Sequence, residues 1–313
     1  MQGLVTVFGG SGFVGTQIVH ALAHQGWRIR IASRKPGRAY DTQPFGDVGQ
    51  IQRVRADVTD RASVARALEG AVACVNLPGV LHGRFEAIHV DGARNVAEAC
   101  ATLGVQRLVH MSAIGADIDS PSEYARTKGE GEQAVRRAFP DATILRPSIV
   151  FGPEDGFFNR FAAMASFSPV LPLFGGGETR YQPVYVGDVA QAVARALIDT
   201  AAPGQTYELA GPSTYSFKEL MQLILRETGK SRILLPLPHA AATMIGMVGN
   251  VQALVMEPIL TTDQALLLRQ DNVASPNRPG LEALGVRPTS VEAIVPTYLW
   301  RYRKGGQFAE AAA

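Results

Sequence analysis

The chain has 313 residues, a net charge of +2 and an apolar content of 46%, values typical of a soluble globular protein with one large or two smaller domains. It contains no dense basic block, so composition does not favour nucleic-acid binding. Cys74 and Cys100 lie in apolar segments without metal-ligand spacing, which indicates buried reduced thiols, and we expect no metal site.

A glycine-rich turn follows the first predicted strand, which covers residues 4–8. Gly10, Gly12 and Gly15 have the spacing G-x-G-x-x-G, and an apolar helical pattern begins at Val14. Glycine permits a tight turn and close approach of a pyrophosphate, while the helix N-terminus offers N–H groups and a positive dipole end. A strand, this turn and a helix in that order predict a dinucleotide site. We assign to it the residues Gly9, Gly10, Ser11, Gly12, Phe13, Val14 and Gly15.

The end of the second predicted strand, residues 28–32, indicates which dinucleotide to expect. An NAD site usually has an acidic residue about 20 positions further along the chain, where it binds the ribose 2′-hydroxyl. This chain has Ser33, Arg34 and Lys35 there, and its first acidic residue is Asp41. A guanidinium and a hydroxyl can bind a 2′-phosphate that a carboxylate would repel. The sequence therefore predicts NADP(H), unless Arg34 and Lys35 are an ordinary solvated pair.

Strand and helix patterns alternate through the first half of the chain. Further strands are expected at residues 52–56, 71–77, 105–112 and 143–146. Helices are expected up to Leu68, with Asp60 or Ser63 as the cap, and at residues 85–103 and 122–139. This alternation predicts an α/β fold with a doubly wound parallel sheet. We expect a Rossmann domain at 1–150, with returns to its sheet near 178–212, and a smaller, mainly helical region at 151–177 and 213–313.

Tyr124 and Lys128 are four residues apart on a predicted helix, so their side chains share one face. Ser112 ends the preceding strand, and Asn95 lies on the helix before it. Strand ends at the carboxyl edge of such a sheet border the cofactor crevice. A nearby ammonium lowers a tyrosine pKa from about 10, so Tyr124 can transfer a proton while Ser112 holds the substrate oxygen. We take Ser112, Tyr124 and Lys128 as the catalytic residues; the alternative is an ordinary surface pair on a helix.

Together these motifs resemble the extended and atypical short-chain dehydrogenase/reductase superfamily over about the first 210 residues. Four stretches are also similar to the nucleotide-binding accessory subunit of respiratory complex I and its bacterial relatives: SEYARTKGEGE, AFPDATILRPSIVFGPEDGFFNRFA, QPVYVGDVA and LTTDQALLLRQDN. That likeness implies tightly held NADPH, attachment to a membrane-bound NADH:quinone oxidoreductase and little turnover. A related branch is tied to ubiquinone biosynthesis.

The resemblance also implies roles for individual residues. It assigns Gly9, Gly12 and Gly15 to the pyrophosphate, Ser33, Arg34 and Lys35 to the 2′-phosphate, and Asp57 to the adenine. It adds as further cofactor contacts Val58, Leu77, Pro78, Tyr124, Lys128 and Pro147. Asn76-Leu77-Pro78-Gly79 replaces the small-residue run usual after the fourth strand of the extended enzymes. A sugar-nucleotide substrate is therefore not expected.

The second half of the chain has three apolar or aromatic segments. Residues 151–177 have Arg160 as their single cation, which favours an apolar ligand or a protein or lipid surface; the alternative is an ordinary core. The uncharged stretch 239–256 predicts a buried or interfacial helix rather than a membrane span. The basic, aromatic run 300–304 is typical of a membrane surface or an anionic partner, or of a solvated helix end.

Three functions remain open. The first is an NADP(H)-holding accessory or assembly protein that docks on respiratory complex I subunits, peripheral on the inner face of the bacterial inner membrane. The second is an active NADP(H)-dependent oxidoreductase or epimerase-type enzyme on an apolar, quinone-like carbonyl. The third is a redox-sensing regulator. Because the first strand begins at residue 4, we expect no leader and a cytoplasmic protein. The histidines, His89 among them, lack metal spacing and are expected to be structural.

Overall fold

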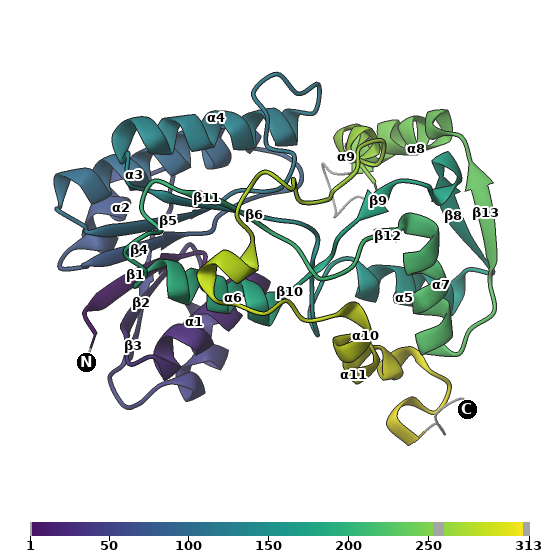
Figure 1. Ribbon diagram of the computed structural model, residues 1–313, viewed down its shortest axis with the longest axis horizontal. Helices are drawn as coiled ribbons and strands as arrows, with labels where there is room; N and C mark the ends of the chain where they lie inside the picture. The colour runs from purple at the N-terminus through teal and green to yellow at the C-terminus, as the bar shows by residue number, and fades with distance from the viewer. Residues whose placement is uncertain (1, 253–259, 309–313) are drawn as a thin grey trace. The chain divides into compact units, whose positions relative to one another are not determined.

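The computed structural model describes residues 2–252 and 260–308, which form two compact units (Figure 1). The first unit comprises residues 2–147, 186–209 and 275–287, and the second comprises 148–185, 210–252, 260–274 and 288–308. Compared with the expected boundaries, residues 148–150, 178–185 and 210–212 lie in the second unit, and residues 275–287 lie in the first.

A seven-stranded parallel sheet forms the centre of the first unit, in the order β11-β6-β5-β4-β1-β2-β3. Its strands are β1 (Leu4–Phe8), β2 (Arg28–Ser33), β3 (Ile51–Arg55), β4 (Ala73–Asn76), β5 (Arg107–Met111), β6 (Thr143–Pro147) and β11 (Thr206–Leu209). The doubly wound sheet predicted from the alternating pattern is therefore confirmed. Because β1 pairs with both β2 and β4, the winding reverses beside β1, and ligands of such sheets bind at that point of reversal.

Helices cover both faces of this sheet. On one face α1 packs against α6, and on the other α2, α3 and α4 lie side by side (Figure 1). Their bounds are α1 (Phe13–His24), α2 (Arg61–Leu68), α3 (Ala93–Thr102), α4 (Glu123–Ala138) and α6 (Val186–Ala196). Two 3-10 helices, η1 (Pro36–Phe45) and η4 (Leu281–Leu284), complete the first unit. The helix expected at 85–103 starts with a π-helical segment, η2 (Glu86–Gly92), before α3.

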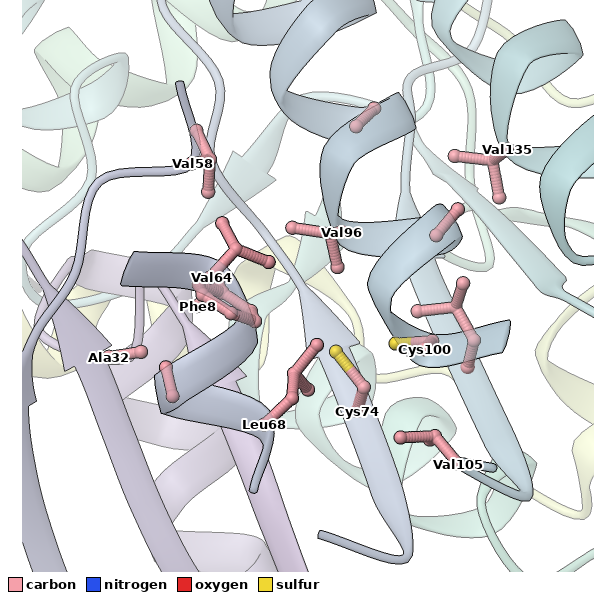
Figure 2. Packing of buried hydrophobic residues seen from close by; sticks show 14 of the residues in the cluster. Phe8, Ala32, Val58, Val64, Leu68, Cys74, Val96, Cys100, Val105 and Val135 are labelled. Atoms are coloured by element: carbon pink, nitrogen blue, oxygen red, sulfur yellow. The ribbon is translucent and has the colours of Figure 1, made fainter. Parts of the chain in front are cut away.

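The main core of the first unit lies between the sheet and α2, α3 and α4. Figure 2 shows Phe8 and Cys74 on the strands facing Val64, Val96 and Cys100 on the helices. Both cysteines are free and fully buried, as expected. Burial, with a contact to Cys100, raises the pKa of the Cys74 thiol, so this pair is chemically inert packing.

Side-chain caps explain where two of these helices begin. Asp60 Oδ1 accepts the N–H of Ala62 at 3.0 Å and caps α2, whereas Ser63, the alternative cap, accepts the N–H of Asp57. Ser122 caps α4 in the same way. A side-chain oxygen at these positions satisfies a backbone donor that has no partner within the helix.

The second unit is built from short strands and helices. Its strands pair as β7 (Val150–Phe151) with β10 (Val184–Tyr185), β8 (Val170–Phe174) with β13 (Ile233–Leu237), and β9 (Arg180–Tyr181) with β12 (Tyr215–Ser216). Its helices are α5 (Phe158–Phe167), α7 (Phe217–Thr228), α8 (His239–Gln252), α9 (Thr262–Leu267), α10 (Val291–Ile294) and α11 (Pro296–Leu299), with 3-10 turns η3 (Gly175–Gly177), η5 (Trp300–Tyr302) and η6 (Gly306–Phe308).

The apolar stretch 151–177 forms much of the core of the second unit. Phe157 stacks edge-on against Phe161 and Phe217, with ring centroids 5.2 and 6.2 Å apart, and Phe158 is fully buried. Phe167 is the exception, because its side chain is exposed. The core interpretation therefore accounts for this stretch, and its composition alone no longer favours an apolar ligand.

Three further expectations fall in the second half of the chain. Of residues 178–212, β11 joins the large sheet, but β10 pairs with β7 in the second unit instead. Helix α8 covers the uncharged stretch as far as residue 252, and residues 253–256 lie outside the described part of the chain. None of the helices in residues 2–252 and 260–308 combines the length and the apolar character needed to cross a bilayer. In the basic run 300–304, Arg303 pairs with Glu227 on α7.

Candidate functional site

The glycine turn forms a tight cradle between β1 and α1. Gly9 has a φ of +79°, which favours glycine, and its carbonyl oxygen accepts the N–H of Gly12 at 3.1 Å. A Cβ on Gly15 would lie 2.3 Å from that oxygen and 2.7 Å from the Cα of Gly10, so a side chain there cannot be accommodated. Gly12 provides no capping side chain to α1, and the first turn contains no carboxylate. The Gly12 N–H is used within the turn, and the other backbone N–H groups at the start of α1 can bind an anion.

The end of β2 presents a hydroxyl and two cations. Ser33 Oγ is buried and has no hydrogen-bond partner among the described residues. Arg34 and Lys35 follow it with exposed side chains. A buried hydroxyl that lacks a partner carries a desolvation cost, which a ligand at this strand end would offset.

Asp57 lies at the end of β3 and is held as a carboxylate. Its Oδ1 accepts the backbone N–H and the hydroxyl of Thr59 at 3.0 and 2.9 Å. Burial raises its pKa, but these hydrogen bonds and the charges of Arg34 and Arg84 outweigh burial, so the net pKa is lowered. The positive charges of Arg34 and Arg84 thus both favour the ionised form of this carboxyl group.

Asn95 supports the neighbouring loop. Its Nδ2 donates to the carbonyl oxygen of Val58 at 3.0 Å, and its Oδ1 accepts from Arg61 Nε at 3.0 Å. A Cβ on Gly92 would lie 2.7 Å from Val58 Cγ2, so Val58 is also held by close packing. Asn95, which the sequence placed on the helix before the Ser112 strand, therefore positions Val58.

The segment after β4 lies beside the glycine turn. A Cβ on Gly9 would lie 3.4 Å from Leu77 Cβ and 3.5 Å from Pro78 Cδ, so these two expected cofactor contacts border the cradle. Asn76, the last residue of β4, lies 3.1 Å from Nδ1 of His110, and its Oδ1 is buried without a partner in the described structure. Burial lowers the pKa of His110 to about 3, with a smaller effect of Lys128, so this imidazole is neutral.

Two of the predicted catalytic residues, Ser112 and Lys128, meet near the end of β5. Tyr124 lies one turn before Lys128 on α4. Lys128 Nζ donates to the carbonyl oxygen of Met111 at 3.2 Å, directly before Ser112. Ser112 Oγ is buried, and no partner for it lies within the described residues. The Tyr124 ring stacks edge-on against His89 at a centroid distance of 5.5 Å. Burial lowers the pKa of Lys128 to about 8, while the nearby Glu132 opposes this effect.

Pro147 lies one strand further along the same edge. It ends β6, and its carbonyl oxygen accepts the N–H of Ile114 at 3.0 Å, which holds the chain after Ser112 against β6. The structure thus brings the glycine turn, the end of β2, the segment after β4 and the end of β5 to one edge of the sheet. This is the edge at which α/β proteins bind ligands.

The sequence model that describes the NAD dependent epimerase/dehydratase family matches residues 5–210 of this chain. The chain belongs to this family. It is 35% identical over 307 residues to subunit 9 of the NADH dehydrogenase [ubiquinone] 1 alpha subcomplex from Rattus norvegicus, covering 96% of this chain and 80% of the rat protein. It is 31% identical to the NADH-ubiquinone oxidoreductase 40 kDa subunit from Neurospora crassa, covering 97% and 80%. The expected kinship with the complex I subunit is confirmed.

Among solved structures, the NADPH complex of the quinone oxidoreductase QOR2 from Escherichia coli superposes with a TM-score of 0.76. It is 21% identical and covers 95% of this chain and 99% of that one, so the likeness concerns the fold. Membership of the family shows an NAD(P)-binding protein. The glycine cradle and the partnerless hydroxyls of Ser33 and Ser112 fit such a dinucleotide.

The chain has the groups for acid–base chemistry at a carbonyl. A bound nicotinamide would supply hydride transfer. For the residues themselves, Ser112 Oγ can donate to a substrate oxygen, and Tyr124 can transfer a proton there. With a pKa of about 8, Lys128 keeps most of its positive charge at neutral pH.

Four residues of this region had no assigned role before the structure was known. They are Asn76, Arg84, His89 and His110. Asn76 and His110 end neighbouring strands, and a polar residue there is a signal that sequence reading can use. Arg84 and His89 do not end a predicted strand, so no sequence pattern placed them at the site.

Proposed function

We propose that this protein binds NADP(H) in preference to NAD(H). The main support is found at the end of β2, where the Ser33 hydroxyl is buried without a partner among the described residues. The exposed cations of Arg34 and Lys35 follow it. No carboxylate occurs before Asp41, so nothing in the first forty residues repels a 2′-phosphate. A fork-shaped guanidinium and a hydroxyl donor are complementary to a phosphate dianion.

Calorimetry with the purified protein tests this preference. NADPH should bind at least about tenfold more tightly than NADH, which corresponds to about 1.4 kcal/mol. The preference should weaken as salt is raised, because exposed cations are screened. Equal affinity, or tighter NADH binding, would contradict the proposal.

We further propose that the protein is an accessory or assembly component that associates with a respiratory complex I. Support comes from the named subunits of this enzyme in rat and Neurospora crassa, whose similarity extends over nearly the whole chain. The location that follows is peripheral, on the inner face of a bacterial inner membrane. In the second unit, Met244 and Met247 of α8 and Ile233 of β13 are 66, 54 and 63% exposed, and an apolar surface of this kind suits a partner or a membrane.

Gentle solubilisation of membranes tests the association. The tagged full-length protein should co-purify with the large subunits of the oxidoreductase and with NADPH. The variant Met244→Glu/Met247→Glu should lose the subunits and keep NADPH, because the changes lie outside the first unit. Retention of NADPH without any complex I subunit from wild-type membranes would contradict the association while leaving the cofactor proposal intact.

A second candidate is an active NADP(H)-dependent oxidoreductase acting on an apolar carbonyl, of the quinone class used in ubiquinone biosynthesis. It is favoured by the meeting of Ser112 and Lys128 at the end of β5, with Tyr124 on the same helix as Lys128. Oxidation of NADPH by purified protein with short-chain quinones tests it. Turnover that Tyr124→Phe abolishes would favour this candidate over a purely accessory role.

A further inference from the structure

His89 is a buried imidazole that uses both ring nitrogens. It is 2% exposed and lies in the π-helical segment η2. Its Nε2 lies 3.0 Å from the backbone nitrogen of Val80, and its Nδ1 lies 3.0 Å from the hydroxyl oxygen of Thr127. The two contacts reach in different directions, to the segment after β4 and to α4.

The partners determine the protonation of this ring. A backbone N–H can only donate, so Nε2 of His89 accepts from Val80 and carries no proton. The Thr127 hydroxyl donates to the carbonyl oxygen of Glu123 at 2.8 Å, which leaves its oxygen free to accept from Nδ1–H. The geometry thus requires the neutral Nδ1–H tautomer. Burial, with a smaller effect of Lys128, lowers the pKa of His89 to about 3, in agreement.

These two hydrogen bonds of His89, to Val80 and to Thr127, form a tie between the segment Leu77–Val80 and α4. The segment lies against the Lys128 amine. A Cβ on Gly79 would lie 3.2 Å from Lys128 Nζ and 3.7 Å from His89 Nε2, so the backbone at Gly79 passes directly beside both groups. The Phe85 ring packs on His89 with a centroid distance of 5.5 Å. The segment is therefore held at one end by the hydrogen bond from the Leu77 N–H to the carbonyl oxygen of Phe8, and at the other end by the hydrogen bond to His89 and by packing.

We propose that His89 is a positioning residue that ties the segment Leu77–Val80 to α4 and so holds its backbone over Lys128 for cofactor binding. The consequence for the cofactor rests on the proposed NADP(H) function, whereas the tie itself does not. The N–H of Leu77 is fixed to the carbonyl oxygen of Phe8 at 3.2 Å, so His89 controls the other end of the segment, from Pro78 to Val80, which borders the glycine turn. A loop fixed before binding costs less conformational entropy when the ligand binds.

Two amide substitutions separate the contacts. The amide of His89→Asn ends near the position of Nδ1 and cannot reach Val80. The amide of His89→Gln extends to the position of Nε2 and offers Val80 a carbonyl acceptor. Both variants put a polar amide in the same buried place, so each is the matched control of the other.

The experiment combines amide hydrogen exchange of the cofactor-free protein with NADPH calorimetry. In His89→Asn, exchange at Val80 should rise at least about tenfold relative to the amides of β4, and the Kd for NADPH should weaken by about tenfold, the effect of one lost hydrogen bond. In His89→Gln both should stay within about threefold of wild type. Unchanged exchange at Val80 in His89→Asn would overturn the tie, and so would equal loss in both variants.

The calorimetry with NADPH tests the effect of His89 on cofactor binding separately from the hydrogen bond itself. Faster exchange at Val80 with an unchanged Kd for NADPH would overturn the positioning role of His89. If the wild-type protein binds no NADPH, the proposed function fails, and exchange at Val80 still decides whether His89 holds the segment. A rise in exchange across all amides of β4 together with Val80 would mean that His89 acts on the whole core, and would also overturn the proposal.

Discussion

Arg146 and Glu132 form a bidentate ion pair that joins β6 to α4. Arg146 Nε and Nη2 donate to the two carboxylate oxygens of Glu132 at 2.8 and 2.7 Å, and the side chains are 16 and 7% exposed. Glu208 on β11 lies 3.5 Å from the third nitrogen of Arg146. Arg146 directly precedes Pro147 in β6, and Glu132 lies on α4. The pair therefore fixes α4, which carries Tyr124 and Lys128, relative to the sheet.

Removal of the charge at Glu132 should destabilise the fold. Glu132→Gln leaves Arg146 buried with Glu208 as its remaining anion, so we expect the free energy of unfolding to fall by about 1–3 kcal/mol. Urea denaturation measures this change. The control is Glu130→Gln, which breaks the exposed pair with Arg126 at 3.8 Å and should change stability by less than about 0.5 kcal/mol. Equal effects of the two variants would contradict a special role for the buried pair.

Much of the fold follows from local patterns. Each predicted strand of the first unit lies within two or three residues of its observed bounds, because apolar β-branched runs between helical patterns leave few alternatives. The glycine spacing likewise predicted the tight cradle, since the contacts of Gly15 permit no side chain. Where a helix cap was ambiguous, between Asp60 and Ser63, the structure selected Asp60 through its bond to Ala62.

The remaining features depend on contacts between distant segments. The π-helical start at Glu86–Gly92 lies where Gly131 lets α4 approach the backbone of His89, with a Cβ position 2.1 Å from its carbonyl oxygen. Asn95 was placed on its helix by the sequence pattern, but its hydrogen bond to Val58, which is 37 positions away in sequence, was not predicted. His89 looked like an ordinary core histidine because its partner Val80 is unremarkable in sequence. Periodicity does not encode such pairings.

Arg34→Asp should discriminate between the two cofactors. We expect it to weaken NADPH binding by about 2–4 kcal/mol and to leave NADH almost unchanged, because it replaces a charge-assisted contact by repulsion of the 2′-phosphate. Calorimetry with both nucleotides measures this. Arg28→Asp is the matched control: Arg28 is also exposed, but it lies at the opposite end of β2. An equal loss for NADPH and NADH would refute the assignment of Arg34.

Tyr124→Phe should leave NADPH binding within about twofold of wild type. The change removes a hydroxyl and keeps the ring contacts to His89 and Phe85. If the wild-type protein oxidises NADPH with a quinone, the variant should be slower by about 100-fold or more, as for loss of a general acid. The rate is measured from the decrease of NADPH absorbance over time. Equal rates would exclude Tyr124 as the proton donor.

The stability of the protein should fall in acid partly because of its buried histidines. The pKa of His89 is lowered from 6.5 to about 3, so between these values the unfolded chain binds a proton that the native chain does not. Stability is therefore lost as pH falls from 6.5 towards 3, at up to about 1.4 kcal/mol per pH unit. His89→Gln should lose about 3 kcal/mol less than wild type between pH 6.5 and 4, measured by urea unfolding.

Lys128→Met should make the cofactor-free protein more stable and a poorer binder. Burial lowers the pKa of Lys128 from 10.5 to about 8, which means that its charge is costly in the native state at pH 7. We expect a gain of about 1–3 kcal/mol in the free energy of unfolding and a loss of about tenfold in NADPH affinity. The gain should shrink as pH rises from 8 to 10.5, because the native amine is then already neutral. Lys304→Met, at an exposed position, should change neither quantity. A less stable Lys128→Met protein would show that the amine contributes more to packing than its buried charge costs.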